Sequence, residues 1–352
     1  MVSKKMLLPI ELVNPGMKTA DVVFNKEGNV MLWDGVALDG LTIQRLKNVG
    51  IYELYIQLDQ PQEMSVFNYD EDSPERFKLE YENDLNSTKQ MFQSISSGRK
   101  IDIEATNNIV NSIVKKSESN RIIIDTITQV RSIDEYTYYH SINVSMLCMI
   151  IGKWLRLDEY HIKNLTQAGL LHDVGKSKIS LEILNKPGKL TDSEFNEMKR
   201  HSEYGYNIVK DSEDVPPEVS KAILTHHEKE DGSGYPIGLI GNKLNLYSKI
   251  ITVSDIFDAM TANRSYKSKD TPFKVFELMQ HGSFGILDPI VLKVFLDNIT
   301  TYYMGAKVLL NTGEQGTVVF MNKSNLSRPV VQIDDRYIDT SVSKIVRIKE
   351  FV

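Results

Sequence analysis

Apolar residues between positions 135 and 298 recur every three to four residues, which is the spacing of α-helices that bury one face. Thr191 and Glu194 have the spacing of a capping box and mark the start of one helix. The pattern therefore predicts a mainly α-helical domain. Its expected helices are Tyr138–Trp154, Glu159–Gly175, Asp192–Lys210, Glu218–Glu228, Leu246–Ala262 and Phe273–His281.

The two ends of the chain have a different pattern. Near the N-terminus we expect one helix, Leu41–Asn48, which stops at Gly50 because glycine is the usual residue just past a helix end. Strands are expected around it at Asp21–Phe24, Asn29–Trp33 and Tyr52–Gln57. After residue 302 the period becomes that of short strands, expected at Ala306–Leu310, Thr317–Asn322, Val330–Ile333 and Ser343–Ile348.

These patterns predict a multidomain chain in four parts. Residues 1–60 form a small α+β N-terminal module, and residues 61–126 form an acidic linker and a helical connector with a break near Gly98. Residues 127–298 form the helical domain, and residues 299–352 form a small all-β C-terminal module. The connector could pack on the helical domain or pair with a second copy, so a homodimer is left open.

Composition narrows the classes of function. The chain has 352 residues, of which 41% are hydrophobic and 25% charged, as in soluble globular proteins. No apolar run approaches the ~18 residues of a membrane span, and no secretory signal is visible, so a cytoplasmic location is expected. The net charge of −6 argues against binding to a nucleic acid polymer. The single cysteine, Cys148, is expected to be a small buried hydrophobe.

Several ionisable residues lie on the apolar faces of these helices. Apolar residues follow His140 at +4, +7 and +11, so its ring should face the core. His172 has the same setting and precedes Asp173, and Asp255 lies between apolar residues at −4 and +4. Taken singly, each could be a hydrogen-bonded core residue or a salt-bridge partner.

Taken together, the histidines and carboxylates indicate a metal centre. Imidazole supplies a neutral nitrogen and Asp supplies negative charge, and mixed nitrogen and oxygen ligation without cysteine favours iron or manganese, with zinc or nickel as alternatives. The ligands are too many for one ion, so we predict two divalent ions. Such a pair can activate water and hold the phosphate oxygens of an in-line displacement.

Four segments resemble the HD-GYP family of the HD phosphohydrolase superfamily. They are LLHDVGK at 170–176, KPGKLTDSEFNEMKRHSEYG at 186–205, HHEKEDGSGYPIGL at 226–239 and NRSYK at 263–267. The resemblance covers about residues 125–298. It implies a cyclic di-GMP phosphodiesterase that produces linear pGpG, with GMP as a further product left open.

The resemblance also assigns roles to residues. It implies that Asp173 and Lys176 are catalytic and that Lys176, Tyr235, Arg264 and Lys267 bind the substrate. The metal ligands that it implies are His140, His172, Asp173, His201, His226, His227 and Asp255.

Some family members bind a third metal through a Glu one helical turn before the first His. Tyr136 stands at that position here and Glu135 is one place off, which favours two metals and argues against efficient conversion of pGpG to GMP. Simpler roles stay open for the substrate residues. Lys176, Arg264 and Lys267 could neutralise helix ends, and Tyr235 could serve the turn.

Three other functions remain in competition. The chain could be a cyclic di-GMP receptor without turnover, although all predicted ligands are present. It could hydrolyse another cyclic dinucleotide or a nucleoside phosphate, although the Gly-Tyr-Pro and R-x-Y-K segments disfavour a mononucleotide. It could also be a scaffold in which the flanking modules carry the function.

Overall fold

The computed structural model describes residues 4–10, 13, 15–25, 30–51, 53–58, 74–116, 120–129, 136–261, 271–282, 285–343 and 345–352. The chain divides into two compact units, Met1–Arg76 and Phe77–Val352. Each unit is described by itself below. Within the described residues, no helix is both long and apolar enough to cross a membrane.

The N-terminal unit contains two small antiparallel sheets and one helix. Strand β1 (Lys4–Pro9) pairs with β4 (Glu53–Leu58), and β2 (Val23–Phe24) pairs with β3 (Val30–Leu32). Helix α1 (Gly40–Asn48) ends before Gly50, whose φ of +77° confirms the expected glycine stop. Strand β1 was not predicted, because its residues KKMLLP do not alternate between apolar and polar.

The connector consists of three helices, α2 (Pro74–Ser96), α3 (Ile103–Lys115) and α4 (Asn120–Gln129). The predicted break near Gly98 is confirmed, since this residue has φ +87° just after α2. Asp102 then caps α3 by accepting a hydrogen bond from the backbone N–H of Ala105 at 2.9 Å. These helices belong to the same compact unit as the predicted helical domain.

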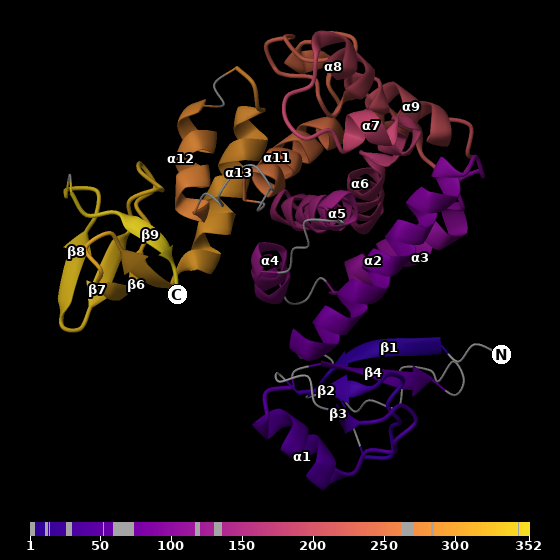
Figure 1. Ribbon diagram of the computed structural model, residues 1–352. Helices are drawn as coiled ribbons and strands as arrows, with labels where there is room; N and C mark the ends of the chain where they lie inside the picture. The colour runs from indigo at the N-terminus through magenta and orange to yellow at the C-terminus, as the bar shows by residue number, and fades with distance from the viewer. Residues whose placement is uncertain are drawn as a thin grey trace. The chain divides into compact units, whose positions relative to one another are not determined.

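Helix α5 (Tyr136–Trp154) lies at the centre of the second unit. Every residue from His140 to Gly152 is buried, because α6 (Glu159–Leu171) and α11 (Leu246–Thr261) pack along it together with α3 and α13 (Pro289–Ile299). Figure 1 shows α5 running through the middle of the surrounding helices. The core is therefore built around α5. Cys148 is fully buried in it, as predicted, and burial raises the pKa of its thiol to about 12.

The other helical segments are short. They are η4 (Val174–Lys178), α7 (Leu181–Leu184), α8 (Asp192–Lys199), α9 (His201–Val209), α10 (Pro217–Thr225), η5 (Gly241–Lys243), α12 (Pro272–Gly282) and η6 (Thr300–Tyr303). Two predicted helices were too long, since Glu159–Gly175 ends at Leu171 and Glu218–Glu228 ends at Thr225. A third, Asp192–Lys210, is broken at Arg200. Helix α13 was missed, although Asp288 caps it and Pro289 begins it.

A five-stranded antiparallel sheet follows in the order β8-β7-β6-β5-β9. Its strands are β5 (Lys307–Leu310), β6 (Gln315–Phe320), β7 (Val330–Ile333), β8 (Arg336–Asp339) and β9 (Ile348–Phe351). The predicted strand Ser343–Ile348 was wrong, and β8 was missed. Both errors fall on the two edge strands, which are mostly exposed and therefore lack an apolar alternation. Phe351 stacks on Phe273 of α12, with ring centroids 5.3 Å apart.

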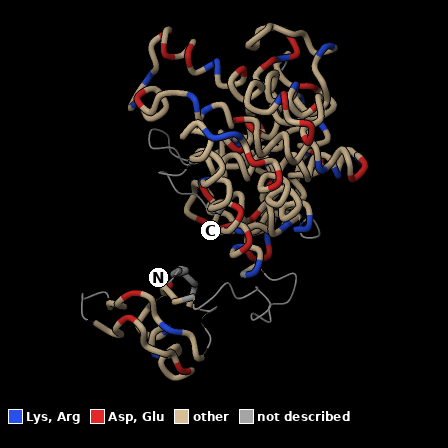
Figure 2. Tube along the Cα trace, turned by 90° about the vertical axis from the view of Figure 1, so that its right-hand side faces the viewer, with Lys and Arg blue, Asp and Glu red and all other residues tan. Residues whose placement is uncertain are grey.

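Charges of both signs are interspersed over the described part of the chain (Figure 2). This distribution differs from the one-sided basic face that is typical of nucleic-acid-binding proteins.

Candidate metal centre

Three of the predicted ligands are oriented by the same local contact. The Nδ1–H groups of His172, His201 and His226 donate to the backbone carbonyls of Gly169, Met198 and Ile223, at 2.7, 2.7 and 2.8 Å. Each carbonyl belongs to a residue three places earlier, in the last turn of a helix where carbonyls lack partners within the helix. The contact therefore fixes the tautomer and leaves each Nε2 with a lone pair directed into the centre.

Asp173 lies immediately past α6, and its side chain is buried. Its Oδ2 is 3.6 Å from His140 Nε2 and 3.4 Å from His172 Nε2, and its Oδ1 is 3.4 Å from His201 Nε2. One carboxylate thus faces ligands on both sides. The helix prediction through Gly175 had placed Asp173 on a regular α-helix. Instead the chain enters the 3-10 helix η4, in which residues three apart eclipse each other.

This 3-10 geometry explains the spacing between Asp173 and Lys176. Lys176 Nζ lies 2.5 Å from Asp173 Oδ2, and the lysine side chain is 23% exposed, so it can still reach a ligand. Gly175 between them has to be glycine, because a Cβ there would lie 1.9 Å from the carbonyl oxygen of His201. The backbone of η4 thereby touches α9 and brings Asp173 and His201 together.

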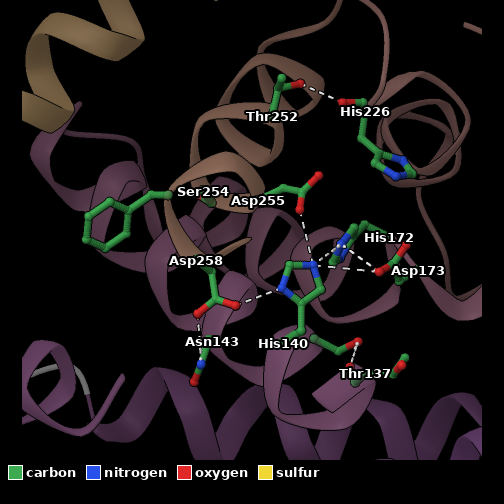
Figure 3. A network of polar contacts seen from close by, with 12 residues as sticks. Thr137, His140, Asn143, His172, Asp173, His226, Thr252, Ser254, Asp255 and Asp258 are labelled. Atoms are coloured by element: carbon green, nitrogen blue, oxygen red, sulfur yellow. Dashed lines mark hydrogen bonds and ion pairs between the residues drawn. The ribbon is translucent and has the colours of Figure 1, made fainter. Parts of the chain in front are cut away.

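His140 is oriented differently, by a carboxylate instead of a backbone carbonyl. Its Nδ1 is 2.8 Å from Asp258 Oδ2, and its Nε2 is 3.2 Å from Asp255 Oδ1 (Figure 3). Asp258 also accepts a hydrogen bond at 2.9 Å from the side-chain amide of Asn143. Sequence reasoning missed Asp258 and Asn143. The only available signal was that each lies three residues after a predicted ligand on the same helix.

His227 and Tyr235 form the more exposed side of the centre. His227 Nε2 is 3.1 Å from His201 Nε2, and its Nδ1 is 4.0 Å from Asp255 Oδ2. The ring of Tyr235 packs on His227 with centroids 4.7 Å apart at 32°. Burial raises the pKa of Tyr235, so its hydroxyl stays protonated.

The loop that carries Tyr235 is held by Glu228, a buried residue that sequence reasoning did not single out. Its carboxylate accepts backbone N–H hydrogen bonds from Ile237, Gly238 and Leu239, at 2.7 to 3.1 Å. Gly234 approaches the backbone so closely that a Cβ would lie 2.4 Å from Glu228 Cα. Asp231 accepts a hydrogen bond from the backbone N–H of Ser233 at 2.9 Å, so it fixes the loop.

The structure brings all seven predicted ligands together from distant parts of the chain. Their donor atoms form two groups, each with all atoms within 4.8 Å of one another. One group contains Asp173, His201, His226 and His227, and the other contains His140, His172 and Asp255. The predicted substrate residues Arg264 and Lys267 lie outside the described residues, as does Glu135. The side chain of Tyr136 is not described.

The protonation states of six of the seven residues suit metal ligation. Burial lowers the pKa of His172, His201 and His226, and it lowers that of His227 to about 3, so these four imidazoles are neutral. Burial opposes the charge of Asp173 and Asp255 as well. For Asp173, the ammonium group of Lys176 outweighs it, and for Asp255, His140 does, so both carboxyl pKa values are lowered. His140 differs, because Asp255 and Asp258 overcome its burial and raise its pKa to about 9.

The residues present fit a pair of cations. With each Nδ1 protonated, the Nε2 lone pairs of His201 and His226 face each other at 3.3 Å, which is unfavourable unless a positive charge lies between them. Asp173 Oδ1 is buried and has no hydrogen-bond partner among the described residues. An unsatisfied buried carboxylate oxygen is costly. Nitrogen and oxygen donors without sulfur are a typical set for iron, manganese or zinc.

The sequence model of the HD domain family matches residues 113–291, just over half of the chain. The chain belongs to the HD domain family. The match begins within α3, so α2 lies outside it. All seven predicted ligands of the HD domain lie inside the match.

Two relatives of this chain are named as phosphodiesterases and come from bacteria. Cyclic di-GMP phosphodiesterase PA4108 of Pseudomonas aeruginosa is 33% identical over 243 residues, which are 69% of this chain and 58% of that protein. 3′3′-cGAMP-specific phosphodiesterase 1 of Vibrio cholerae is 39% identical over 173 residues, which are 48% of this chain and 39% of that protein. The chain therefore spans less than two thirds of the length of either relative.

A solved structure shares the fold. Bd1817, an HDG"Y"P protein from Bdellovibrio bacteriovorus, superposes with a TM-score of 0.58 at 17% identity, covering 84% of this chain and 99% of that one. At this identity the likeness concerns the fold alone. It supports a mainly helical HD-type domain with a C-terminal sheet.

Proposed function

We propose that the chain is a metal-dependent phosphodiesterase that hydrolyses cyclic di-GMP to linear pGpG. The observation that carries the proposal is the convergence of five imidazoles and two carboxylates on one buried centre. The similarity to phosphodiesterases of cyclic dinucleotides supports the substrate class.

The proposed ligands of the two ions follow the two groups of donor atoms. His140, His172 and Asp255 would hold one ion, and the other four residues would hold the second. Asp173 could serve both ions, because its two oxygens face the two groups. Two ions are favoured over three because Tyr136 replaces a third-metal Glu, and for the same reason pGpG is the expected product.

Bound divalent ions would lower the pKa of water and offset the negative charge of a phosphodiester. The chain's own residues supply the rest. Lys176 is ion-paired with Asp173 and partly exposed, so its ammonium group can shift toward a phosphate oxygen and neutralise it. Asp173 would orient the attacking water, and the neutral imidazoles keep the ions in place without adding charge.

The nucleobase would meet Tyr235, whose ring lies beside His227 at the exposed side of the centre. Arg264 and Lys267 remain proposed contacts to the second phosphate, Arg through its planar fork and Lys as a point charge. We further propose that residues 1–60 and 299–352 are separate modules flanking the catalytic helices. A homodimer, which the sequence left open, finds no support in the relatives.

A second substrate deserves a place in the test because one relative is specific for 3′3′-cGAMP. The two dinucleotides share their phosphodiester linkage and differ in one base, so the metal centre alone does not discriminate between them. The loop around Tyr235 would set the preference.

The test is turnover by the full chain purified without oxygen and loaded with Mn²⁺ or Fe²⁺. We expect about two ions per chain, and linear pGpG from cyclic di-GMP. His172→Ala/Asp173→Ala should lower turnover by more than the roughly 100-fold that loss of an outer-shell partner can cost. His161→Ala is the matched control, because this histidine is also on α6 but is 47% exposed and bonds to Tyr247.

Binding of cyclic di-GMP without any linear product, with either metal, would favour the receptor. Faster hydrolysis of 3′3′-cGAMP than of cyclic di-GMP would make 3′3′-cGAMP the proposed substrate. Equal turnover by the double variant and the chain itself would contradict the metal centre.

A further inference from the structure

The orientation of His140 depends on a buried network of hydrogen-bonded side chains. One of them, Tyr81, lies before residue 113, where the match to the HD domain family begins. Asp258 Oδ2 lies 2.8 Å from the Nδ1 of His140, and its other oxygen accepts a hydrogen bond from Asn143 Nδ2 at 2.9 Å. Figure 3 shows Asp258 between His140 and Asn143, on the side of the ring away from His172. Asn143 Oδ1 in turn accepts a 2.7 Å hydrogen bond from the hydroxyl of Tyr81.

All the side chains in this hydrogen-bonded network are buried. Tyr81 is 0% exposed, and Asn143 and Asp258 are 1% exposed. Tyr81 lies on α2, Asn143 and His140 on α5, and Asp258 on α11, so three helices meet in it. A buried network is costly when one donor or acceptor is lost, because water cannot replace it.

The hydrogen bonds have a definite direction. An amide side chain can turn over and exchange its oxygen and nitrogen. Here the Tyr81 hydroxyl donates to the oxygen, which leaves the NH₂ group facing the Asp258 carboxylate. The reversed amide would set its oxygen against a carboxylate oxygen, so two acceptors would meet. The Asp258 carboxylate therefore favours the orientation of Asn143 that presents its NH₂ group, and the Tyr81 hydroxyl donates to the amide oxygen that this orientation leaves on the other side.

We propose that Tyr81 and Asn143 are positioning residues that act through Asp258 on His140, so that α2 controls the orientation and donor strength of one metal ligand. A carboxylate that accepts from the Nδ1–H of a histidine fixes the ring and raises the basicity of Nε2. The proposal rests on the metal centre of the proposed function. It makes α2 part of the catalytic unit, although the family match begins only at residue 113.

The loss of Mn²⁺ affinity should become smaller with each step away from His140 along these hydrogen-bonded side chains. We expect Asp258→Asn to weaken Mn²⁺ binding by roughly 10–100-fold, the range for partners that hold a metal ligand. Asn143→Leu should cost less, and Tyr81→Phe, which removes one oxygen atom, less again. Binding is measured on the full chain by competition with a chelating indicator.

Tyr138→Phe is the matched control. It removes the same hydroxyl from a tyrosine on the helix of His140, and the ring of Tyr138 packs on Phe92, with centroids 5.6 Å apart. We expect wild-type Mn²⁺ affinity from this variant. Unfolding curves without metal, measured for every variant, separate a loss of stability from a loss of affinity.

A spectroscopic readout tests positioning directly. In the Zn²⁺-loaded full chain with ¹⁵N-labelled histidine, Tyr81→Phe should move the Nδ1 and Nε2 signals of His140 and leave those of His201 unchanged. His201 is the internal reference because its Nδ1 bonds to a backbone carbonyl.

Wild-type affinity together with unchanged His140 signals in Tyr81→Phe would overturn the proposal, whatever the stability of the variant. If Tyr81→Phe does not fold, Asn143→Leu decides by the same two measurements. A wild-type chain that binds neither Mn²⁺ nor Zn²⁺ would overturn the proposed function as well. Normal binding by the wild type and by Tyr81→Phe, together with unchanged His140 signals in the variant, would overturn the positioning role of Tyr81 alone.

Discussion

Two buried polar clusters in the second unit differ in how their charges are balanced. Beside α2 and α3, Lys116 contacts Asp84, and Ser112 bonds to both at 3.1 Å. Lys116 and Asp84 have side chains only 3% and 9% exposed. This cluster is satisfied by the protein itself, since an ammonium faces a carboxylate and a hydroxyl bridges them.

The metal centre has the opposite character. Four neutral imidazoles and two carboxylates face inward, lone pairs point at lone pairs, and Asp173 Oδ1 has no hydrogen-bond partner among the described residues. Lys176 is the single ammonium group that the described residues place against these ligands. Burial alone does not distinguish a structural cluster from a functional one. The balance of donors, acceptors and charge does.

The largest change in the free energy of unfolding should come from removing the cation of the cluster formed by Lys116, Asp84 and Ser112. Lys116→Met leaves the Asp84 carboxylate buried without its cation, which should lower the free energy of unfolding by about 3–5 kcal/mol. Burial already raises the pKa of Asp84, and losing Lys116 raises it further. The folded variant then holds a proton that the unfolded chain has released, so its stability falls as pH rises through the folded pKa. Urea unfolding at several pH values measures both effects.

Asp84→Leu/Lys116→Met should recover most of that loss, because a buried pair replaced by apolar side chains is often neutral. A double variant as unstable as the single one would show that the cluster supports more than its own charges.

A smaller change in the free energy of unfolding should come from adding a divalent cation to the metal centre. Mn²⁺ at 100 times its dissociation constant should raise the free energy of unfolding by about 2.7 kcal/mol per site, because the ion binds only the folded chain. EDTA should reverse the change. Urea unfolding with and without the ion measures it.

The same Mn²⁺ addition should leave His172→Ala/Asp173→Ala close to its metal-free stability. An equal gain in this variant would place the ions elsewhere, and the contrast between the two clusters would fail.

The smallest effect belongs to an exposed ion pair, which provides the baseline. Lys293 and Asp297 lie one turn apart on α13, and the lysine side chain is 73% exposed. Lys293→Ala should change the free energy of unfolding by no more than about 0.5 kcal/mol, because solvent already screens the pair. A loss comparable to that of Lys116→Met would show that burial does not govern these energies.

Sequence patterns predicted what local periodicity encodes. The helices around the centre and the convergence of the seven side chains were anticipated, because each of these residues lies on an apolar face or in a recognisable segment. The break at Arg200 and the 3-10 helix after Asp173 were not predicted. Apolar spacing is similar on both sides of such breaks, whereas the break depends on contacts such as that of Gly175 with α9.

The partners of His140 were beyond sequence reasoning for a related reason. Tyr81 and Asn143 are 62 residues apart, and nothing in the sequence of α2 distinguishes this tyrosine from one that fills the core. Edge strands β8 and β9 were misplaced because pairing with a neighbouring strand, and not their own composition, keeps them extended. Such long-range pairings need coordinates.

The contacts to the Nδ1 atoms also imply an order in which the ligands become available. His172, His201 and His226 are each aimed by a carbonyl three residues away, so their direction is set as soon as the last helical turn forms. The ring of His140 is oriented by Asp258, which lies 118 residues later in the sequence. Forming this contact costs the conformational entropy of closing that long loop. A folding chain would therefore present three oriented imidazoles early and complete the set only when α11 docks on α5.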